Sequence, residues 1–209
     1  MTFIKICGIT NLEDALVSIE VGAHALGFNF HPASPRYIEP AAARQIIKQI
    51  PANVLTVGVF VNQENPAQVE RIAHEAGVSA LQLHGDESPD YCDALVDRFV
   101  IKAISVRRDF QPERARDYKV QAIMLDAFNE NVRGGTGQTI DWSIAREVRE
   151  MVPRLFLAGG LSPENIAEAI SVVQPYAVDA CSKLELRPGK KDHERLRAFM
   201  EAIRTTARH

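Results

Sequence analysis

Two side chains that can exchange protons with a substrate stand at the ends of apolar segments. Cys7 ends the segment Phe3–Cys7 and precedes Gly8, and Asp126 directly follows the segment Gln121–Leu125. A thiolate can act as a general base when nearby positive charge or donors lower its pKa. A partly desolvated carboxyl group can act as a general acid. The alternatives are a small buried thiol and a carboxylate that caps its loop, and both stay open until a fold places these residues.

Three further polar side chains are candidates for contacting a ligand. Arg36 lies in the sequence Ser-Pro-Arg-Tyr, where proline stiffens the loop. A guanidinium held in this way can form a bidentate pair with a carboxylate, although most loop arginines are simply solvated. Gln82 and His84 lie at the end of the apolar segment Ser79–Leu83 and directly after it. They join the candidate site because the ends of apolar strands are where polar groups gather in many enzymes.

A phosphate site is indicated near the end of the chain. Gly159 and Gly160 precede a helical pattern that is expected to begin at Pro163. Backbone N–H groups next to a helix start can hold a phosphate. Ser182 and Lys183 follow the last apolar segment, where the serine can donate a hydrogen bond and the lysine can add charge.

A glycine-rich segment follows Asp126 along the chain. Gly134–Gly137 reads Gly-Gly-Thr-Gly and lies within the long stretch 127–139. Such a segment is either a flexible connection or a lid over a site. Its position directly after Asp126 favours the lid.

Imine formation on a lysine and metal binding are the alternatives to proton transfer by Cys7 and Asp126. Lys5 and Lys102 lie within apolar segments, where an amine can form an imine with a carbonyl substrate, but neither lysine ends its segment. Lys5 shares strand parity with Cys7, so we expect it one layer deeper, as a source of positive charge. Cys7, His84 and Asp126 are chemically able to bind a metal, but the other histidines show no ligand spacing. A metal site is therefore not expected.

Apolar, β-branched segments alternate with helical patterns along the whole chain. The expected strands are Phe3–Cys7, Ala25–Phe30, Val54–Val61, Ser79–Leu83, Phe99–Ile104, Gln121–Leu125, Arg154–Ala158 and Tyr176–Ala180. The expected helices are Leu12–Val21, Ala41–Ile50, Ala67–Ala76, Asp90–Val96, Glu113–Tyr118, Trp142–Met151, Pro163–Val173 and Asp192–Thr205. Helix starts at Asn11 and Pro40 and a helix end at Gly77 agree with these limits.

This alternation predicts an α/β fold, a single-domain (β/α)8 TIM barrel over residues 1–209. A doubly wound open sheet is the rival architecture, but no Gly-x-Gly-x-x-Gly follows the first strand. Chemistry in such barrels takes place at the carboxyl ends of the strands. Cys7 and Asp126 would end strands one and six, and so they are expected to face each other across the barrel mouth.

The composition of the chain limits the kinds of partner that it is expected to bind. The chain has 209 residues, 24 basic and 27 acidic side chains and a net charge of -3, which favours neither nucleic acid nor a membrane surface. No segment is long and apolar enough to suggest a signal peptide or a membrane span. The three cysteines lack a disulfide spacing, which favours a reducing, cytoplasmic location. We expect a small-molecule substrate, and the sequence leaves open a monomer or a homodimer.

Taken in order, several of these segments resemble the phosphoribosylanthranilate isomerase family of tryptophan biosynthesis. The matching segments are Lys5–Thr10, Gly27–Phe30 with Ser34–Arg36, Val57–Asn62, Leu81–Gly85, Asp126 with Gly134–Gly137, Asp141–Trp142 and Ala158–Leu161. They cover essentially the whole chain.

The resemblance implies an Amadori rearrangement that opens the ribose ring of N-(5′-phosphoribosyl)anthranilate and yields 1-(2-carboxyphenylamino)-1-deoxyribulose 5-phosphate. It implies that Asp126 is the general acid at the ring oxygen and that Cys7 is the base that removes the proton from C2′. Arg36 would hold the anthranilate carboxylate. Gly160 and Ser182 would hold the phosphate. The resemblance also implies that no cofactor or metal is needed, because the substrate's own nitrogen supplies the electron sink.

One segment departs from the family pattern. Where the family typically has Ser-Ser-Gly-Val-Glu, this chain has Cys181-Ser182-Lys183-Leu184-Glu185, so a lysine replaces a glycine at the phosphate end. If that position required a positive φ angle, lysine would be strained there. The alternatives to the isomerase are another phosphate-binding barrel, such as indole-glycerol-phosphate synthase or a histidine-pathway sugar isomerase, and a non-catalytic binding barrel.

Overall fold

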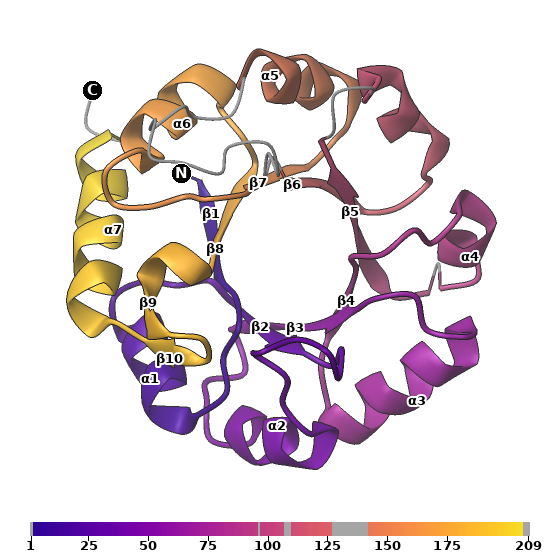
Figure 1. The fold of residues 1–209 in the computed structure, drawn as a ribbon, viewed down its shortest axis with the longest axis horizontal. Coiled ribbons are helices and arrows are strands. Elements are labelled where there is room, and N and C mark those ends of the chain that lie inside the picture. Colours follow the sequence, from indigo (N-terminus) through magenta and orange to yellow (C-terminus); the bar gives the residue numbers. More distant parts are fainter. Residues whose placement is uncertain (1, 96, 107–109, 127–141, 207–209) are drawn as a thin grey trace.

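The computed structural model describes residues 2–95, 97–106, 110–126 and 142–206. Eight parallel strands close into a barrel in sequence order, and helices surround it (Figure 1). The strands are β1 (Phe3–Ile6), β2 (Ala25–Asn29), β3 (Leu55–Phe60), β4 (Ala80–Leu83), β5 (Phe99–Ser105), β6 (Ala122–Asp126), β7 (Leu155–Ala158) and β8 (Ala177–Ala180). Each agrees with its predicted segment to within one residue at either end. The predicted (β/α)8 barrel is confirmed.

The helical segments follow the strands as predicted, with four differences in type or extent. They are α1 (Leu12–Glu20), α2 (Pro40–Ile47), α3 (Pro66–Ala76), α4 (Pro89–Asp93), the 3₁₀ helix η1 (Pro112–Asp117), α5 (Trp142–Met151), α6 (Ile166–Val173) and α7 (His193–Thr206). Two of the differences are early ends, since α2 ends at Ile47 and not at Ile50, and α4 ends at Asp93 and not at Val96. The segment predicted as a helix over Glu113–Tyr118 is a 3₁₀ helix that ends where Tyr118 becomes extended. The helix predicted to begin at Pro163 begins at Ile166, because the residues before it form a turn in which Asn165 N–H donates to Ser162 O.

The core has two layers. Small and medium apolar residues such as Ala25, Val57 and Met124 fill the inside of the barrel together with Phe156. A larger cluster lies between the outer faces of the strands and the helices. The strands are therefore apolar on both faces, which explains why they are near-continuous apolar runs in the sequence.

A short hairpin follows the barrel and was not predicted. The 3₁₀ helix η2 (Ser182–Leu184) leads into β9 (Glu185–Arg187), which pairs with β10 (Lys190–Lys191) in antiparallel fashion. Lys190 pairs with Glu13 and Asp14 of α1, which fixes the hairpin over the amino end of that helix (Figure 1). Both strands are too short and polar to give a periodic signal.

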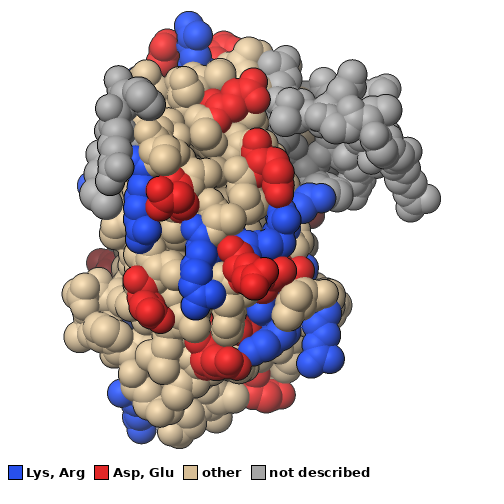
Figure 2. Space-filling model, turned by 90° about the vertical axis from the view of Figure 1, so that its left-hand side faces the viewer, with Lys and Arg blue, Asp and Glu red and all other residues tan. Residues whose placement is uncertain are grey.

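The surface carries both signs of charge. On the side of the molecule that lies at the left of Figure 1, Lys and Arg side chains are interspersed with Asp and Glu (Figure 2). This mixture agrees with the small net charge of -3. In the described ranges, no helix combines the length and the apolar character that crossing a membrane requires.

Candidate active site

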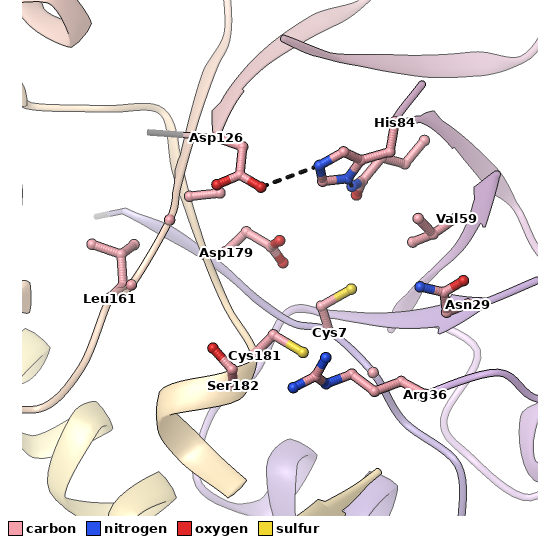
Figure 3. Close-up of a pocket in the computed structure, with 15 residues that line it drawn as sticks. Cys7, Asn29, Arg36, Val59, His84, Asp126, Leu161, Asp179, Cys181 and Ser182 are labelled. Atoms are coloured by element: carbon pink, nitrogen blue, oxygen red, sulfur yellow. Dashed lines mark hydrogen bonds and ion pairs between the residues drawn. The ribbon is translucent and has the colours of Figure 1, made fainter. Parts of the chain in front are cut away.

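A cavity of about 230 Å³ opens at the carboxyl ends of the strands (Figure 3). Eight of the nine residues predicted for the site line it. They are Cys7, Arg36, Gln82, His84, Asp126, Gly159, Gly160 and Ser182. The structure therefore brings together residues that lie up to 175 positions apart in the sequence, as the barrel topology predicts.

Cys7 lies directly after β1 at the floor of the cavity. Its backbone N–H donates to Ala180 O at 2.9 Å, and its side chain is buried. A hydrogen bond from the Cys181 thiol lowers the pKa of Cys7 well below the usual thiol value, and the positive charges of Lys5 and Lys191 add to this effect against the opposing influence of burial. This environment favours the thiolate form of Cys7. The alternative of an inert buried thiol does not fit this environment.

The packing around Cys7 explains a glycine in the neighbouring strand. A Cβ atom at Gly27 would lie 2.6 Å from the Cys7 Sγ, which is closer than two such atoms can approach. The glycine therefore leaves room for the large sulfur atom beside β2. Any larger residue at position 27 would push the thiolate away from its position.

The positive charge next to Cys7 belongs to a buried ion pair. The sequence predicted Lys5 as its source but did not reveal the acidic partner, Asp179. Lys5 Nζ lies 2.7 Å from the Asp179 carboxylate, and both side chains are buried inside the barrel. Burial opposes the charge on Lys5, but Asp179 and the Cys7 thiolate outweigh it and raise the lysine pKa. Burial also raises the pKa of Asp179 to about 7, against the attraction of Lys5. Lys5 is therefore an ammonium that stabilises the thiolate, not a free amine nucleophile.

Asp126, the last residue of β6, forms a polar chain across the cavity. Its Oδ2 atom lies 3.2 Å from His84 Nε2, and His84 Nδ1 lies 2.7 Å from Gln82 Nε2 (Figure 3). Because the Gln82 amide donates to Nδ1, the imidazole proton is on Nε2 and points at the carboxyl group. In the described part of the chain, the buried Gln82 Oε1 has no hydrogen-bond partner although Gln82 lines the cavity. That oxygen is an acceptor available to a ligand.

Arg36 is held by a partner that the sequence did not reveal. Its Nε and Nη2 atoms donate to the Glu185 carboxylate at 2.9 and 2.6 Å. Lys191 Nζ approaches the same carboxylate at 3.0 Å, and both Glu185 and Lys191 are almost fully buried. Within the described residues, the Nη1 atom of Arg36 forms no hydrogen bond. The guanidinium fork is thus partly occupied, and its remaining donors face the cavity.

The residues predicted to hold a phosphate, Gly159, Gly160 and Ser182, line the same cavity. Gly159 and Gly160 have φ angles of +93° and +66°, which favour glycine, and a Cβ at Gly160 would meet no atom within 4 Å. A backbone without side chains therefore leaves this part of the cavity open. The helix α6 begins six residues after Gly160, so the predicted contribution of a helix start is weaker than the sequence suggested.

Lys183 stands apart from the other predicted residues. It is exposed, lies in η2 and does not line the cavity, while its carbonyl oxygen accepts a hydrogen bond from Arg195 at 2.7 Å. In the described ranges only Asn62 and Gln174 have positive φ angles among residues other than glycine, so the lysine is not strained. Its contact with a ligand stays a prediction.

Two further expectations concern a lid and metal chemistry. The proposed lid at Gly134–Gly137 lies outside the described residues. Within those residues, no three His, Cys, Asp or Glu side chains are grouped so that they could hold a metal ion. Cys7, His84 and Asp126 do not form such a group.

Comparison with known proteins agrees with this geometry. The family model for N-(5′-phosphoribosyl)anthranilate (PRA) isomerase matches residues 4–202. The chain is 50% identical to an N-(5′-phosphoribosyl)anthranilate isomerase of Geobacter sp. strain M21 over 200 residues, which are 96% of this chain and 97% of that protein.

Solved structures of phosphoribosyl anthranilate isomerases are also similar to this chain. The crystal structure of phosphoribosyl anthranilate isomerase from Thermotoga maritima superposes with a TM-score of 0.89 at 45% identity, covering 98% of this chain and all of the other. A structure of such an isomerase in complex with reduced 1-(o-carboxyphenylamino)-1-deoxyribulose 5-phosphate has a TM-score of 0.86 at 43% identity, with coverage of 98% and 100%. The chain therefore belongs to the N-(5′-phosphoribosyl)anthranilate isomerase family.

Proposed function

We propose that this barrel isomerises N-(5′-phosphoribosyl)anthranilate with Asp126 as the general acid and Cys7 as the general base. The isomerase function, a step of tryptophan biosynthesis, follows from family membership along almost the whole chain. The assignment of roles rests on one observation. A thiolate stabilised by Lys5 and Lys191 and a carboxyl group at the end of β6 line one cavity.

The first step is ring opening at the Asp126 side. Asp126 donates a proton to the furanose ring oxygen, the bond between that oxygen and C1′ breaks, and the nitrogen lone pair forms a C1′=N Schiff base. His84 orients the carboxyl group through its Nε2 atom, 3.2 Å away. The proton transfer is productive only when the ring oxygen lies within hydrogen-bond reach of the carboxyl group.

The second step belongs to Cys7. The thiolate removes the proton from C2′, and the electron pair of the C–H bond moves into the Schiff base to give an enolamine. The enolamine then tautomerises to the ketone 1-(2-carboxyphenylamino)-1-deoxyribulose 5-phosphate. Because the substrate's own nitrogen accepts the electrons, the proposal requires no cofactor. The hydrogen bond from Cys181 and the charges of Lys5 and Lys191 favour the ionised form of Cys7 between turnovers.

Binding groups surround these two residues. Arg36 binds the anthranilate carboxylate through the donors that Glu185 leaves free. The backbone N–H groups of Gly159 and Gly160, together with Ser182, bind the phosphate. Gln82 Oε1 accepts a hydrogen bond from a ribose hydroxyl, which satisfies its buried lone pairs. We propose that the enzyme works in the cytoplasm on this small molecule, without nucleic acid or membrane partners.

A turnover assay tests the function directly. The chain is mixed with N-(5′-phosphoribosyl)anthranilate, and the loss of anthranilate-type fluorescence is followed. The isomerase predicts catalytic loss of fluorescence that scales with enzyme concentration. A non-catalytic barrel would bind the substrate without turning it over, and a histidine-pathway isomerase or indole-glycerol-phosphate synthase would act only on its own substrate. Either result would overturn the proposal.

Replacing Lys183 with glycine is expected to leave kcat/KM within about two-fold of the parent value, as for other exposed positions. The side chain lies outside the cavity, and its backbone shows no strain that glycine would relieve. Steady-state kinetics and competition by inorganic phosphate measure the effect. Lys183→Gln serves as the matched control, because it removes the charge without adding backbone freedom. A large rise in KM with both variants would show that Lys183 is a phosphate ligand.

A further inference from the structure

Two thiols lie side by side at the mouth of the barrel. The register of β1 and β8 pairs Ile6 with Ala180, and Cys7 N–H continues this ladder by donating to Ala180 O at 2.9 Å. Cys7 and Cys181 are therefore the next neighbours across the two strands. Both line the cavity, and neither is part of a disulfide (Figure 3).

The backbone spacing at this position suits a disulfide. Neighbouring strands lie about 4.7–4.9 Å apart, and disulfides join Cα atoms that are about 4.4–6.8 Å apart. The side chains two residues earlier, Lys5 and Asp179, already touch across the same face at 2.7 Å. Beyond these strands, a side-chain hydrogen bond joins the Cys7 and Cys181 thiols. The two sulfur atoms therefore lie next to each other in the cavity that both residues line.

The two sulfur atoms have complementary protonation states. Cys7 is the thiolate, for the reasons given above. Its hydrogen bond with Cys181 raises the pKa of Cys181 well above the usual value, so Cys181 is the protonated partner. Lys191 Nζ lies 3.8 Å from the Cys181 sulfur. A nucleophilic thiolate next to a second thiol is the arrangement found at redox-sensitive sites.

We propose that Cys7 and Cys181 form a reversible disulfide when the enzyme meets a hydroperoxide, so that the active site contains an oxidative modification site. The formation of the bond depends only on the two thiols. Its effect on turnover rests on the proposed role of Cys7 as the base. With Cys7 in a disulfide, no thiolate remains to take the C2′ proton.

The reaction takes place in two balanced steps. The Cys7 thiolate attacks one oxygen of the peroxide, the O–O bond breaks, and Cys7 becomes a sulfenic acid while the leaving alkoxide or hydroxide takes a proton from water. The peroxide is reduced by two electrons and the sulfur is oxidised by two. The Cys181 sulfur then attacks the sulfenic sulfur, the S–S bond forms, and the hydroxyl group leaves as water with the Cys181 proton. A dithiol reverses the modification by thiol–disulfide exchange.

Oxidation of Cys7 to the sulfenic acid makes Cys181 more reactive toward it. The hydrogen bond with the Cys7 thiolate is the main cause that raises the pKa of Cys181, and it disappears when Cys7 becomes a neutral sulfenic acid. The nearby Lys191 charge then favours the Cys181 thiolate. Cys181 thus becomes a better nucleophile at the moment when its partner becomes an electrophile.

Cys92 provides a natural control for this chemistry. It is buried in α4, away from the cavity, and burial raises its pKa to about 11. It is therefore a thiol with little access to a peroxide in solution. The three cysteines fall in separate tryptic peptides, which span residues 6–36, 72–98 and 155–183.

The test treats the unaltered chain with hydrogen peroxide, blocks free thiols by alkylation and maps the tryptic peptides by mass. We expect a cross-link between peptides 6–36 and 155–183, with an alkylated Cys92. Turnover is expected to fall in proportion to the cross-linked fraction and to return with dithiothreitol. Absence of this cross-link after peroxide treatment would overturn the proposal.

Two variants make the test sharper, each compared with its own untreated activity. In Cys181→Ser, the Cys7 sulfenic acid has no partner and continues to the sulfinic acid, so dithiothreitol no longer restores turnover. Cys92→Ser is expected to behave like the parent. If dithiothreitol restored turnover equally in Cys181→Ser and in the parent, the proposed reversible disulfide would be overturned. A cross-linked protein that still turns over would leave the modification site standing and would refute Cys7 as the base, so the two proposals fail separately.

Discussion

Cys7→Ser is expected to lower kcat by about 10²–10⁴-fold, the usual contribution of a general base. Serine keeps the size and shape that the contact with Gly27 requires. Its hydroxyl group, however, is not ionised at neutral pH, even beside the Lys5 and Lys191 charges that ionise the thiol. Steady-state turnover measures the loss. Binding of the reduced product analogue is expected to stay near the parent value, because the proposed mechanism places the thiolate at C2′ and not at the carboxylate or the phosphate.

Deuterium at C2′ of the substrate identifies the step that is damaged. In Cys7→Ser the removal of this proton limits turnover, so deuterated substrate is expected to react more slowly by a full primary isotope effect. Cys92→Ser is the matched control, since the same change is made at a thiol outside the cavity. If Cys7→Ser turned over substrate as fast as the parent, the role of Cys7 as the general base would be refuted.

The pH dependence of the parent gives a second measure of the same base. A base works only when deprotonated, and the pKa of Cys7 is lowered by its bond with Cys181 and by two lysines. The acidic limb of kcat/KM is therefore expected at a pH well below the usual thiol pKa, where Cys7 takes up a proton. An acidic limb that lies at the usual thiol pKa would contradict the environment described for Cys7.

The barrel and most of its site could be predicted because their signals are local. Each strand is an apolar run that ends in a polar residue, and barrel topology brings such ends together. Cys7 and Asp126 could therefore be placed from their strands alone. For the same reason, the observed ends of the strands lie within one residue of the predicted ends.

The groups that hold these residues in place could not be predicted, because their partners are distant in sequence. Glu185 binds Arg36 across 149 positions, and Asp179 binds Lys5 across 174. Glu185 lies in a hairpin too short to show a strand period, so nothing local marks it as buried. Asp179 interrupts the apolar strand β8, and a carboxylate inside a strand was the one available signal. It points inward together with Lys5, a pairing that parity in both strands would have indicated.

Asp126→Asn is expected to lower kcat by about 10²–10⁴-fold, for a reason different from that of Cys7→Ser. The amide has the same shape and still accepts the hydrogen bond from His84 Nε2, so the side chain keeps its orientation. It cannot donate an acidic proton to the ring oxygen. Ring opening therefore becomes rate-limiting, and binding of the reduced product analogue, whose sugar is already open, is expected to be retained.

The isotope experiment separates the two residues. With Asp126→Asn, turnover waits for the ring to open before the C2′ proton is touched, so deuterium at C2′ is expected to leave the rate almost unchanged. With Cys7→Ser the same substitution slows the reaction. Asp93→Asn, a change at an exposed position in α4, controls for the loss of a carboxylate elsewhere. A full isotope effect in Asp126→Asn would mean that ring opening needs no acid from this residue. His84, whose Nε2 atom lies 3.2 Å from the Asp126 carboxyl group, would then be the next residue to test as the proton donor.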